Sequence, residues 1–587
     1  MNSSPNKYEG WLYGLAFLIA IALRFIQLGA APLTDSEATL ALQALHLAQG
    51  KSEILAPQPA YILLTSLFFL VIESTNFMAR VVPTLVGSAL VFAPYFFRDK
   101  LGARPALILA FLFAIDPGLV ALSRQSNGTI LAVAFLIFAW GLWINRRETA
   151  AGIFLGLALL SGPSVWSGVL TLLLTWVFLR GMNLRPTADQ AMALQQSQDV
   201  ISNSPVSNSL FANHDVRNTL LALLSTVLLA GTLFFTVPNG LSAVFASLPA
   251  YFTGWMTPST STAARTLFTF IAYEVLGISL AVFALVRGFR TGSKRIIRLS
   301  LWLGVALLLA VFYRQADELA WAILPLLALA AMELSRAFDV YREELVEAGV
   351  MVFVIFILMV YIWFNISGLA LNPAAVPTTV PILGTVQDAR AFVLYGLISI
   401  LIVGFALVAF GWSMRMARLG ATWSFAIFFG LYSLGVAWGA SGLRNPGGVE
   451  LWLAESARPL QADLLRASVD DISEFSMGHI NAQPVTIYGV SSPALEWLLR
   501  DNDVTVVSTL DPQMAPPIVI TTVMNDLGLP AAYRGQDFTW RQTPQWAVVQ
   551  NHDWVTWLVF RKLPLERETI LLWARDDLFP DARGSQP

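Results

Sequence analysis

Long apolar runs separated by short polar turns cover the chain from residue 11 to residue 441. Many of these runs approach the roughly 20 residues with which a helix crosses the apolar core of a bilayer. The pattern therefore predicts an α-helical polytopic membrane protein with about thirteen spans. Gly162-Pro163 divides residues 150–179 into two short runs, because a helix does not continue cleanly through proline, so a tight hairpin is expected there. The predicted spans are 11–28, 77–97, 105–122, 128–144, 150–161, 164–179, 218–237, 266–287, 299–313, 319–333, 348–368, 391–411 and 421–441.

A shorter apolar run, residues 60–72, decides the predicted orientation. It lies between Pro59 and Glu73, and its length is typical of re-entrant or interfacial segments. If it does not cross, the turns rich in Lys and Arg, such as 98–104 and 287–298, all fall on one side. The positive-inside rule makes that side cytoplasmic. We therefore expect a multi-pass protein of the cell membrane with a cytoplasmic N-terminus.

Two segments are too polar to lie in a bilayer. Residues 183–216 are rich in Gln, Ser, Asn and Asp, which predicts a flexible cytoplasmic loop. Residues 450–587 contain short β-branched runs at 484–490, 504–509 and 517–522, and 492–501 has a helical pattern. This alternation predicts an extracytoplasmic α/β domain with a parallel sheet. The predicted division is a membrane domain at 1–449, with a first outer loop at 29–76, and the outer domain at 450–587.

Composition narrows the chemistry. Only 13% of the residues are charged, against roughly 25% in average globular domains. The net charge of −2 gives no indication of nucleic-acid binding. The chain has no cysteine, which excludes disulfides, thiolate metal sites and cysteine nucleophiles, and its four histidines argue against a His-rich metal centre.

The first outer loop carries two acidic residues, Asp35 and Glu37, just after the first span. Carboxylates in this position can deprotonate an acceptor hydroxyl or hold a divalent cation, and the sequence leaves the metal and any other cofactor open. A structural interpretation competes with both, because Thr34-Asp35-Ser36-Glu37 also fits a helix capping box. The sequence does not separate catalysis from capping.

Further polar residues lie in or beside the predicted spans. Asp116 precedes a proline and is expected to be buried, which is costly without a partner, and Glu274 is a second acid inside a span. Arg124 and Arg80 each have two interpretations, a phosphate ligand or an anchor at the membrane interface. Asn127 lies on the same predicted face, so these five residues are candidates for substrate binding. Arg314, Asp317 and Glu318 share a short outer turn, where a local ion-pair network is the simplest expectation.

Several short motifs recur near the predicted spans of the N-terminal part. They are Arg24-Phe25, Leu28-Gly29 and Pro32-Leu33 ahead of the two acids, ARVVPTLVG at 79–87, LGARPAL at 101–107 and DPGLVALSRQSNG at 116–128. These motifs resemble those of membrane glycosyltransferases of the C-type fold, the polyprenyl- and dolichyl-phosphate-sugar-dependent mannosyl- and arabinosyltransferases. The likeness is greatest to a branch associated with flippase activity in glycan assembly. It extends over most of the chain, although the acids here are Asp-Ser-Glu where the family has adjacent Asp-Glu.

The resemblance implies a GT-C-like enzyme that moves a sugar from a polyprenyl-phosphate donor to an acceptor on the outer face of the membrane. Asp35 or Glu37 would be catalytic, and Arg124 or Arg80 would stabilise the leaving phosphate. The implied partners are membrane lipid, the polyprenyl-phosphate-linked sugar and a glycan, lipid or protein acceptor. Two alternatives use the same fold without transferase chemistry. One is a lipid-glycan flippase or transport component. The other is a non-catalytic scaffold, which is favoured because Ser36 separates the two acids that are adjacent in the family.

Overall fold

The computed structural model describes residues 8–183, 214–257, 261–371, 379–380, 384–441, 448–452 and 458–579. The flexible loop predicted at 183–216 lies almost wholly outside the described residues. The chain forms two compact units, each described by itself below. We call them the helical unit (1–28, 53–64 and 80–446) and the sheet unit (29–52, 65–79 and 447–587).

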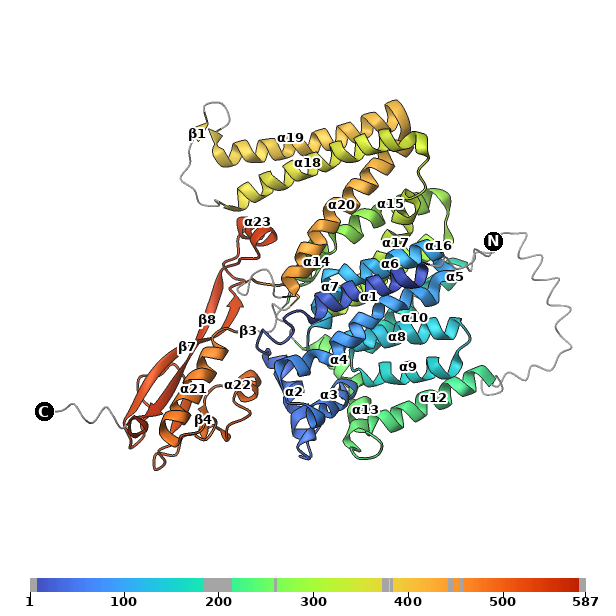
Figure 1. Ribbon diagram of the computed structural model, residues 1–587. Coiled ribbons are helices and arrows are strands. Elements are labelled where there is room, and N and C mark those ends of the chain that lie inside the picture. Colours follow the sequence, from blue (N-terminus) through green and yellow to red (C-terminus); the bar gives the residue numbers. More distant parts are fainter. Residues whose placement is uncertain are drawn as a thin grey trace. The chain divides into compact units, whose positions relative to one another are not determined.

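The helical unit confirms the positions of the predicted apolar helices, since each of the thirteen runs coincides with a helix or a pair of helices (Figure 1). By length and composition, six described helices are candidate membrane spans, or up to eight if each bent pair is one span. The helices that lie wholly or partly in this unit are α1 (Glu9–Phe25), α3 (Pro59–Val71), α4 (Asn76–Ala89), η1 (Leu90–Phe97), α5 (Arg98–Leu101), α6 (Ala103–Ile115), α7 (Pro117–Ser123), α8 (Thr129–Ile144), α9 (Glu148–Leu160), α10 (Ser164–Asn183), α12 (His214–Gly231), α13 (Asn239–Met256), α14 (Ala263–Tyr273), α15 (Val275–Thr291), α16 (Lys294–Tyr313), η3 (Ala316–Leu319), α17 (Ala320–Ala337), η4 (Arg342–Glu344), α18 (Leu345–Leu371), α19 (Val386–Val408), η5 (Ala409–Ser413) and α20 (Met414–Ala440).

Two predicted spans are bent rather than straight. The run 105–122 forms α6 and α7, which meet at 57°, and the run 266–287 forms α14 and α15, which meet at 86°. Asp116 separates the first pair with φ −63° and ψ 124°, because the following Pro117 disfavours a helical conformation at the residue before it. Glu274 separates the second pair without a proline nearby. Both bends therefore place an acidic residue where the helix is interrupted.

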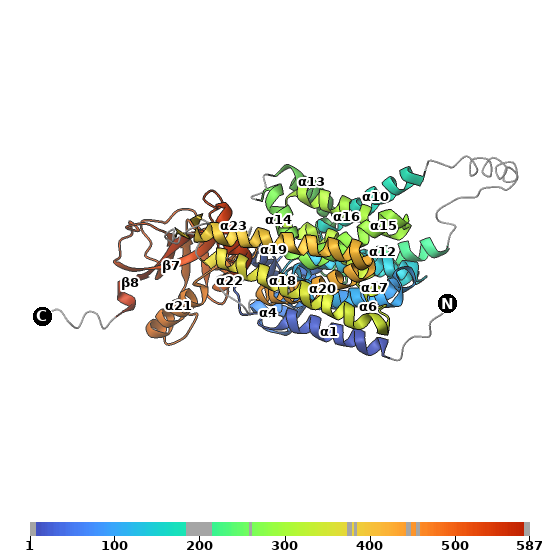
Figure 2. The same ribbon diagram turned by 90° about the horizontal axis from the view of Figure 1, so that it is seen from above.

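Burial distinguishes the helices of this unit. α17 is apolar on all sides and packs against α6, α15 and α16, as expected for a helix at the centre of a bundle. α18 and α19 lie side by side in both ribbon views, and much of their surface is exposed (Figures 1 and 2).

Two smaller features complete this unit. β1 (Thr379–Val380) and β2 (Gly384–Thr385) form a short antiparallel pair ahead of α19. The interruption at Gly162-Pro163 is confirmed, since α9 ends at Leu160 and α10 begins at Ser164.

The sheet unit contains a mixed six-stranded sheet in the order β3-β7-β8-β6-β4-β5. The three strands expected from β-branched runs are parallel, which confirms that part of the prediction. The sheet as a whole is mixed rather than parallel as predicted, because β3, β7 and β8 pair antiparallel. The strands are β3 (Arg458–Pro459), β4 (Val485–Tyr488), β5 (Val504–Val507), β6 (Ile518–Thr522), β7 (Tyr533–Pro544) and β8 (Leu565–Arg575), and the helices are α2 (Asp35–Ala48), α21 (Ala462–Met477), α22 (Pro493–Leu498), α23 (Asn551–Phe560) and η6 (Asp576–Leu578).

The sheet unit also contains residues from the predicted first outer loop. α2 packs against α22, the short helix after β4. The indole of Trp497 donates to the Asn76 side chain at 2.8 Å, and Arg500 donates to Ser74 at 3.2 Å. Because Trp497 is only 2% exposed, residues 29–52 and 65–79 complete the packing of this α/β region.

Candidate functional site

The first-loop acids begin α2, and Glu37 completes the capping box there. The backbone N–H of Glu37 donates to the Thr34 hydroxyl at 3.4 Å, and the backbone N–H of Thr34 donates to the Glu37 carboxylate at 3.0 Å. These bonds satisfy two of the N–H groups that a helix start leaves without partners. Glu37 is 5% exposed, so its carboxylate is buried against the start of its own helix.

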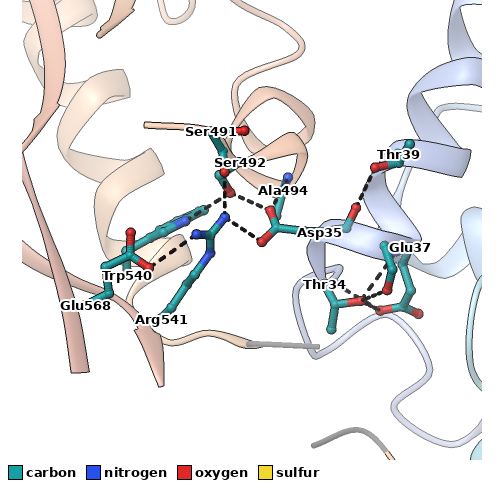
Figure 3. A network of polar contacts seen from close by, with 11 residues as sticks. Thr34, Asp35, Glu37, Thr39, Ser491, Ser492, Ala494, Trp540, Arg541 and Glu568 are labelled. Carbon is teal, nitrogen blue, oxygen red and sulfur yellow. Dashed lines mark hydrogen bonds and ion pairs between the residues drawn. The ribbon is translucent and has the colours of Figure 1, made fainter. Parts of the chain in front are cut away.

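Asp35 instead joins α2 to the sheet of the same unit (Figure 3). Its carboxylate forms an ion pair with Arg541 on β7 at 2.6 Å. It also accepts hydrogen bonds from the Ser492 hydroxyl at 2.6 Å and from the backbone N–H of Ala494 at 3.1 Å. Ala494 lies in the first turn of α22, whose own N-cap side chain makes no capping bond, so Asp35 caps a helix far away in sequence.

Arg541 holds this network together. Besides Asp35, it pairs with Glu568 on β8 at 3.2 Å and donates to the Ser491 carbonyl at 2.8 Å. The Asp35 side chain is 28% exposed and that of Arg541 is 19% exposed. The group is therefore a partly buried ion-pair network in which both oxygens of the Asp35 carboxylate have partners.

In the helical unit, the bend at Asp116 is stabilised from both sides. Asp116 accepts from the backbone N–H of Leu119 at 2.8 Å and so caps α7. The fully buried Arg24 donates to the carbonyls of Phe113 and Ala114 in the last turn of α6, at 2.9 and 3.0 Å. Side chains therefore bond backbone groups on both sides of the break, which a buried backbone requires.

Asp116 and Glu274, predicted separately, lie together. Their side chains are neighbours, and both are almost completely buried. Among the described residues, Oε1 of Glu274 has no hydrogen-bond partner. The two bends therefore meet at a buried pair of acids, with the positive charge of Arg24 close to Asp116.

The two candidate arginines contact backbone carbonyls. Arg124 donates to the carbonyls of Arg24 and Ile26 at the end of α1, at 2.7 and 2.9 Å, and to that of Ser441 after α20 at 2.8 Å. Arg80 donates to the Leu28 carbonyl at 3.1 Å. A cation is favourable at a helix C-terminus, where the carbonyls point outward. Arg124 thereby joins the ends of two helices.

A close approach explains one glycine in the 79–87 motif. A Cβ at Gly87 would lie 2.1 Å from the Ser123 hydroxyl oxygen, which no side chain permits. Ser123 in turn accepts a hydrogen bond from Arg24 at 3.1 Å. The sequence motifs at 79–87 and 116–128 are therefore neighbours, packed against the bend.

A polar group around Asn127 went largely unrecognised in the sequence. The Asn127 side chain donates to Asp317 at 3.2 Å, and the Gln58 side chain accepts from the Gly128 backbone at 2.7 Å. Next to Asp317, Glu318 accepts from the Ser164 hydroxyl at 3.2 Å and is 5% exposed. The simple ion-pair interpretation of the 314–318 turn missed these partners. One feature of the sequence indicated a buried polar partner here: Ser164 is a polar residue at the start of an apolar helix, directly after Gly162-Pro163.

The seven candidate residues thus divide between the units. Asp35 and Glu37 belong to the sheet unit, whereas Arg80, Asp116, Arg124, Asn127 and Glu274 belong to the helical unit. Asp116 and Glu274 come together, and Arg80 and Arg124 both cap carbonyls that follow or end α1. Among the described residues, no group of three His, Asp or Glu side chains is placed to hold a metal ion.

Taken together, the chain is a mostly helical protein with six to eight candidate membrane spans and a C-terminal mixed α/β sheet region, the GT-C architecture. Its fold is similar to that of ArnT from Cupriavidus metallidurans. The crystal structure of ArnT bound to undecaprenyl phosphate aligns with a TM-score of 0.52 and 12% identity, over 88% of this chain and 94% of ArnT. The apo state of ArnT gives the same TM-score at 11% identity.

A weaker likeness is found to the archaeal oligosaccharyltransferase AglB from Archaeoglobus fulgidus, in complex with an inhibitory peptide and a dolichol-phosphate. Its TM-score is 0.41 at 13% identity, over 88% of this chain and 69% of AglB. No protein-family model matches the sequence. No curated protein matches it either.

Proposed function

We propose that this protein is a membrane glycosyltransferase that moves a sugar from a polyprenyl-phosphate donor to an acceptor on the outer face of the cell membrane. The observation that carries the proposal is the ArnT-like fold over 88% of the chain, since ArnT binds undecaprenyl phosphate. In the proposed topology about thirteen spans cross the membrane, the N-terminus is cytoplasmic and residues 450–587 are extracytoplasmic.

Within this proposal, Asp35 rather than Glu37 activates the acceptor hydroxyl. Glu37 is buried and bonded to its own helix start, whereas the Asp35 side chain is 28% exposed. Arg80 and Arg124 supply positive charge near the leaving phosphate, and that charge persists while their N–H groups bond carbonyls.

The test uses the purified full-length protein in proteoliposomes with a panel of undecaprenyl-phosphate-linked hexoses and pentoses. The measurement is release of undecaprenyl phosphate together with transfer of the labelled sugar. Asp35→Asn should lower both by roughly 100-fold or more, the scale of a lost general base. Glu37→Gln is the matched control, because glutamine also completes a capping box, so transfer should be retained. Full activity of Asp35→Asn would show that the assignment of the base is wrong.

A second candidate function, transport of a lipid-linked glycan, is favoured by the two bent helix pairs. Discontinuous helices with polar groups at their breaks are a feature of transporters, and here the breaks carry Asp116 and Glu274 in contact. Movement of a fluorescent polyprenyl-phosphate sugar across the vesicle membrane, measured by quencher accessibility, distinguishes this function. Two results together would support transport. The fluorescent lipid-linked sugar crosses the membrane without release of its sugar, and Glu274→Gln abolishes this movement. If neither activity occurs with any donor of the panel, the non-catalytic scaffold is favoured.

A further inference from the structure

The helical unit has a partly open cavity of about 570 Å³ that none of the proposed transfer or transport residues lines. Its walls come from seven elements, η1, α5, α6, α8, α10, α16 and α17. They are mainly apolar, and Phe113, Ile137 and Leu324 are examples. A volume of this size lies within the range of pockets that bind small molecules and cofactors, roughly 300–1,000 Å³. The cavity therefore has the space and the walls for an apolar ligand.

Three cations lie among the residues that line this apolar space. Lys100, Arg295 and Arg298 all have exposed side chains, and they come from turns that the charge distribution predicts to be cytoplasmic. Among the described residues none of the three has a carboxylate partner. By contrast, five other arginines of the predicted cytoplasmic turns each have one within 3.6 Å: Arg98 with Glu9, Arg104 with Asp339, Arg146 with Asp215, Arg287 with Glu333, and Arg415 with Glu344.

The aromatic residues of the cavity add a polar donor. Trp140, Trp176 and Trp302 line it, and the rings of Trp140 and Trp302 lie 5.6 Å apart. Trp302 is 9% exposed, and its indole N–H has no acceptor among the described residues. Tryptophan is enriched where the acyl region of a bilayer meets the head groups, because one end of its ring is apolar and the other is polar. An ester or phosphate oxygen of a lipid would supply the missing acceptor.

We propose that this cavity binds an anionic diacyl phospholipid of the cytoplasmic leaflet. An acyl chain lies along the apolar walls, and Lys100, Arg295 and Arg298 bind the phosphate. Basic pockets between membrane helices on the cytoplasmic side bind anionic head groups by this combination of charge and apolar depth. The site is separate from the polyprenyl-phosphate site of the proposed function, which faces the other side of the membrane. Both proposals use the same proposed topology, but lipid binding is measured without sugar transfer, so the failure of one is distinguishable from the failure of the other.

The test measures lipid binding to the full-length protein, purified in detergent and stripped of lipid, by native mass spectrometry and by thermal unfolding. Phosphatidylglycerol should bind saturably and raise the unfolding midpoint, and phosphatidylcholine with the same acyl chains should bind at least 10-fold more weakly. Glycerol phosphate alone should have no effect, since it lacks the chain that fills the cavity. Equal binding of the two phospholipids, an equal effect of glycerol phosphate, or tighter binding of undecaprenyl phosphate would overturn the proposal.

Variants locate the site. Lys100→Gln, Arg295→Gln and Arg298→Gln combined should weaken phosphatidylglycerol binding at least 10-fold. The matched control is Arg290→Gln with Lys294→Gln, two exposed cations of the same turn that do not line the cavity, and it should bind normally. Leu172→Trp fills the cavity without changing charge and should also reduce binding. Unchanged binding in the triple variant or in Leu172→Trp, or an equal loss in the control, would show that the lipid binds elsewhere.

Discussion

Asp116 and Asp35 are both aspartates at the start of a helix with an arginine nearby, but the two units use them differently. In the helical unit, Arg24 is completely buried. Its N–H groups donate to carbonyls at the end of α6 and to the Ser123 hydroxyl. In the sheet unit, Arg541 is partly exposed and pairs with carboxylates. A bilayer supplies no water to an interrupted helix, so the cation there must replace the solvent. In the sheet unit water remains available, and the ion pair only adds to the packing.

The largest expected effect comes from removing the buried cation. Arg24→Met keeps the apolar length of the side chain but leaves the carbonyls of Phe113 and Ala114 without a donor and Asp116 without a nearby positive charge. Breaking a buried charged network by removing one partner typically costs about 3–5 kcal/mol. Chemical unfolding in detergent should show a loss of this size, or the variant should fail to accumulate.

The control for this substitution is Arg104→Met. Arg104 forms a 2.8 Å ion pair with Asp339, but the two side chains are 72% and 69% exposed. Exposed pairs contribute about 0–1 kcal/mol, so this variant should unfold almost like the native protein. Similar losses in Arg24→Met and Arg104→Met would contradict the distinction between the two kinds of charge.

The same contrast explains what the sequence could and could not predict. The apolar runs located the helices because their pattern is local, and the capping box was visible because Glu37 lies three positions after Thr34. The 57° bend had a local signal in Pro117. The 86° bend at Glu274 had no local signal, because no proline interrupts the helix there. Glu274 and Asp116 become neighbours only in the fold.

Long-range partners account for the rest. Asp35 contacts Ser492, which is 457 positions away, and no periodicity connects two such segments. β7 and β8 were missed for another reason. Their exposed stretches are polar on both faces, so the strict alternation that identifies a half-buried strand is absent there. The β-branched runs of β4, β5 and β6, in contrast, predicted strands and their parallel pairing.

A smaller effect is expected from the ion pair in the sheet unit. Asp35→Asn, Arg541→Gln and the double variant form a thermodynamic cycle whose coupling free energy measures the contact itself. Because both side chains keep some exposure, at 28% and 19%, we expect a coupling of about 1 kcal/mol. The readout is urea unfolding of the full-length protein followed by tryptophan fluorescence. A coupling near zero would mean that Arg541 is held by Glu568 alone, and one as large as the Arg24 effect would remove the contrast between the units.

The smallest effect concerns Glu496 on α22, where partial burial raises the pKa of the carboxyl group and the nearby His46 on α2 lowers it in part. A carboxyl group whose pKa is raised on folding binds more protons in the folded state. Its contribution to stability is therefore most favourable below the ordinary glutamate value, near pH 4.5, and declines as the pH rises through the raised pKa. Glutamine at position 496 is neutral at every pH. The variant Glu496→Gln should therefore be slightly more stable than the native protein at pH 7, and the difference should vanish near pH 4.

The measurement is the difference in unfolding midpoint between variant and native protein from pH 4 to pH 8. Glu474→Gln, an exposed residue of α21, controls for removal of a charge as such. An advantage of Glu496→Gln that is constant with pH, or one that grows as the pH falls, would mean that burial does not govern this carboxyl group.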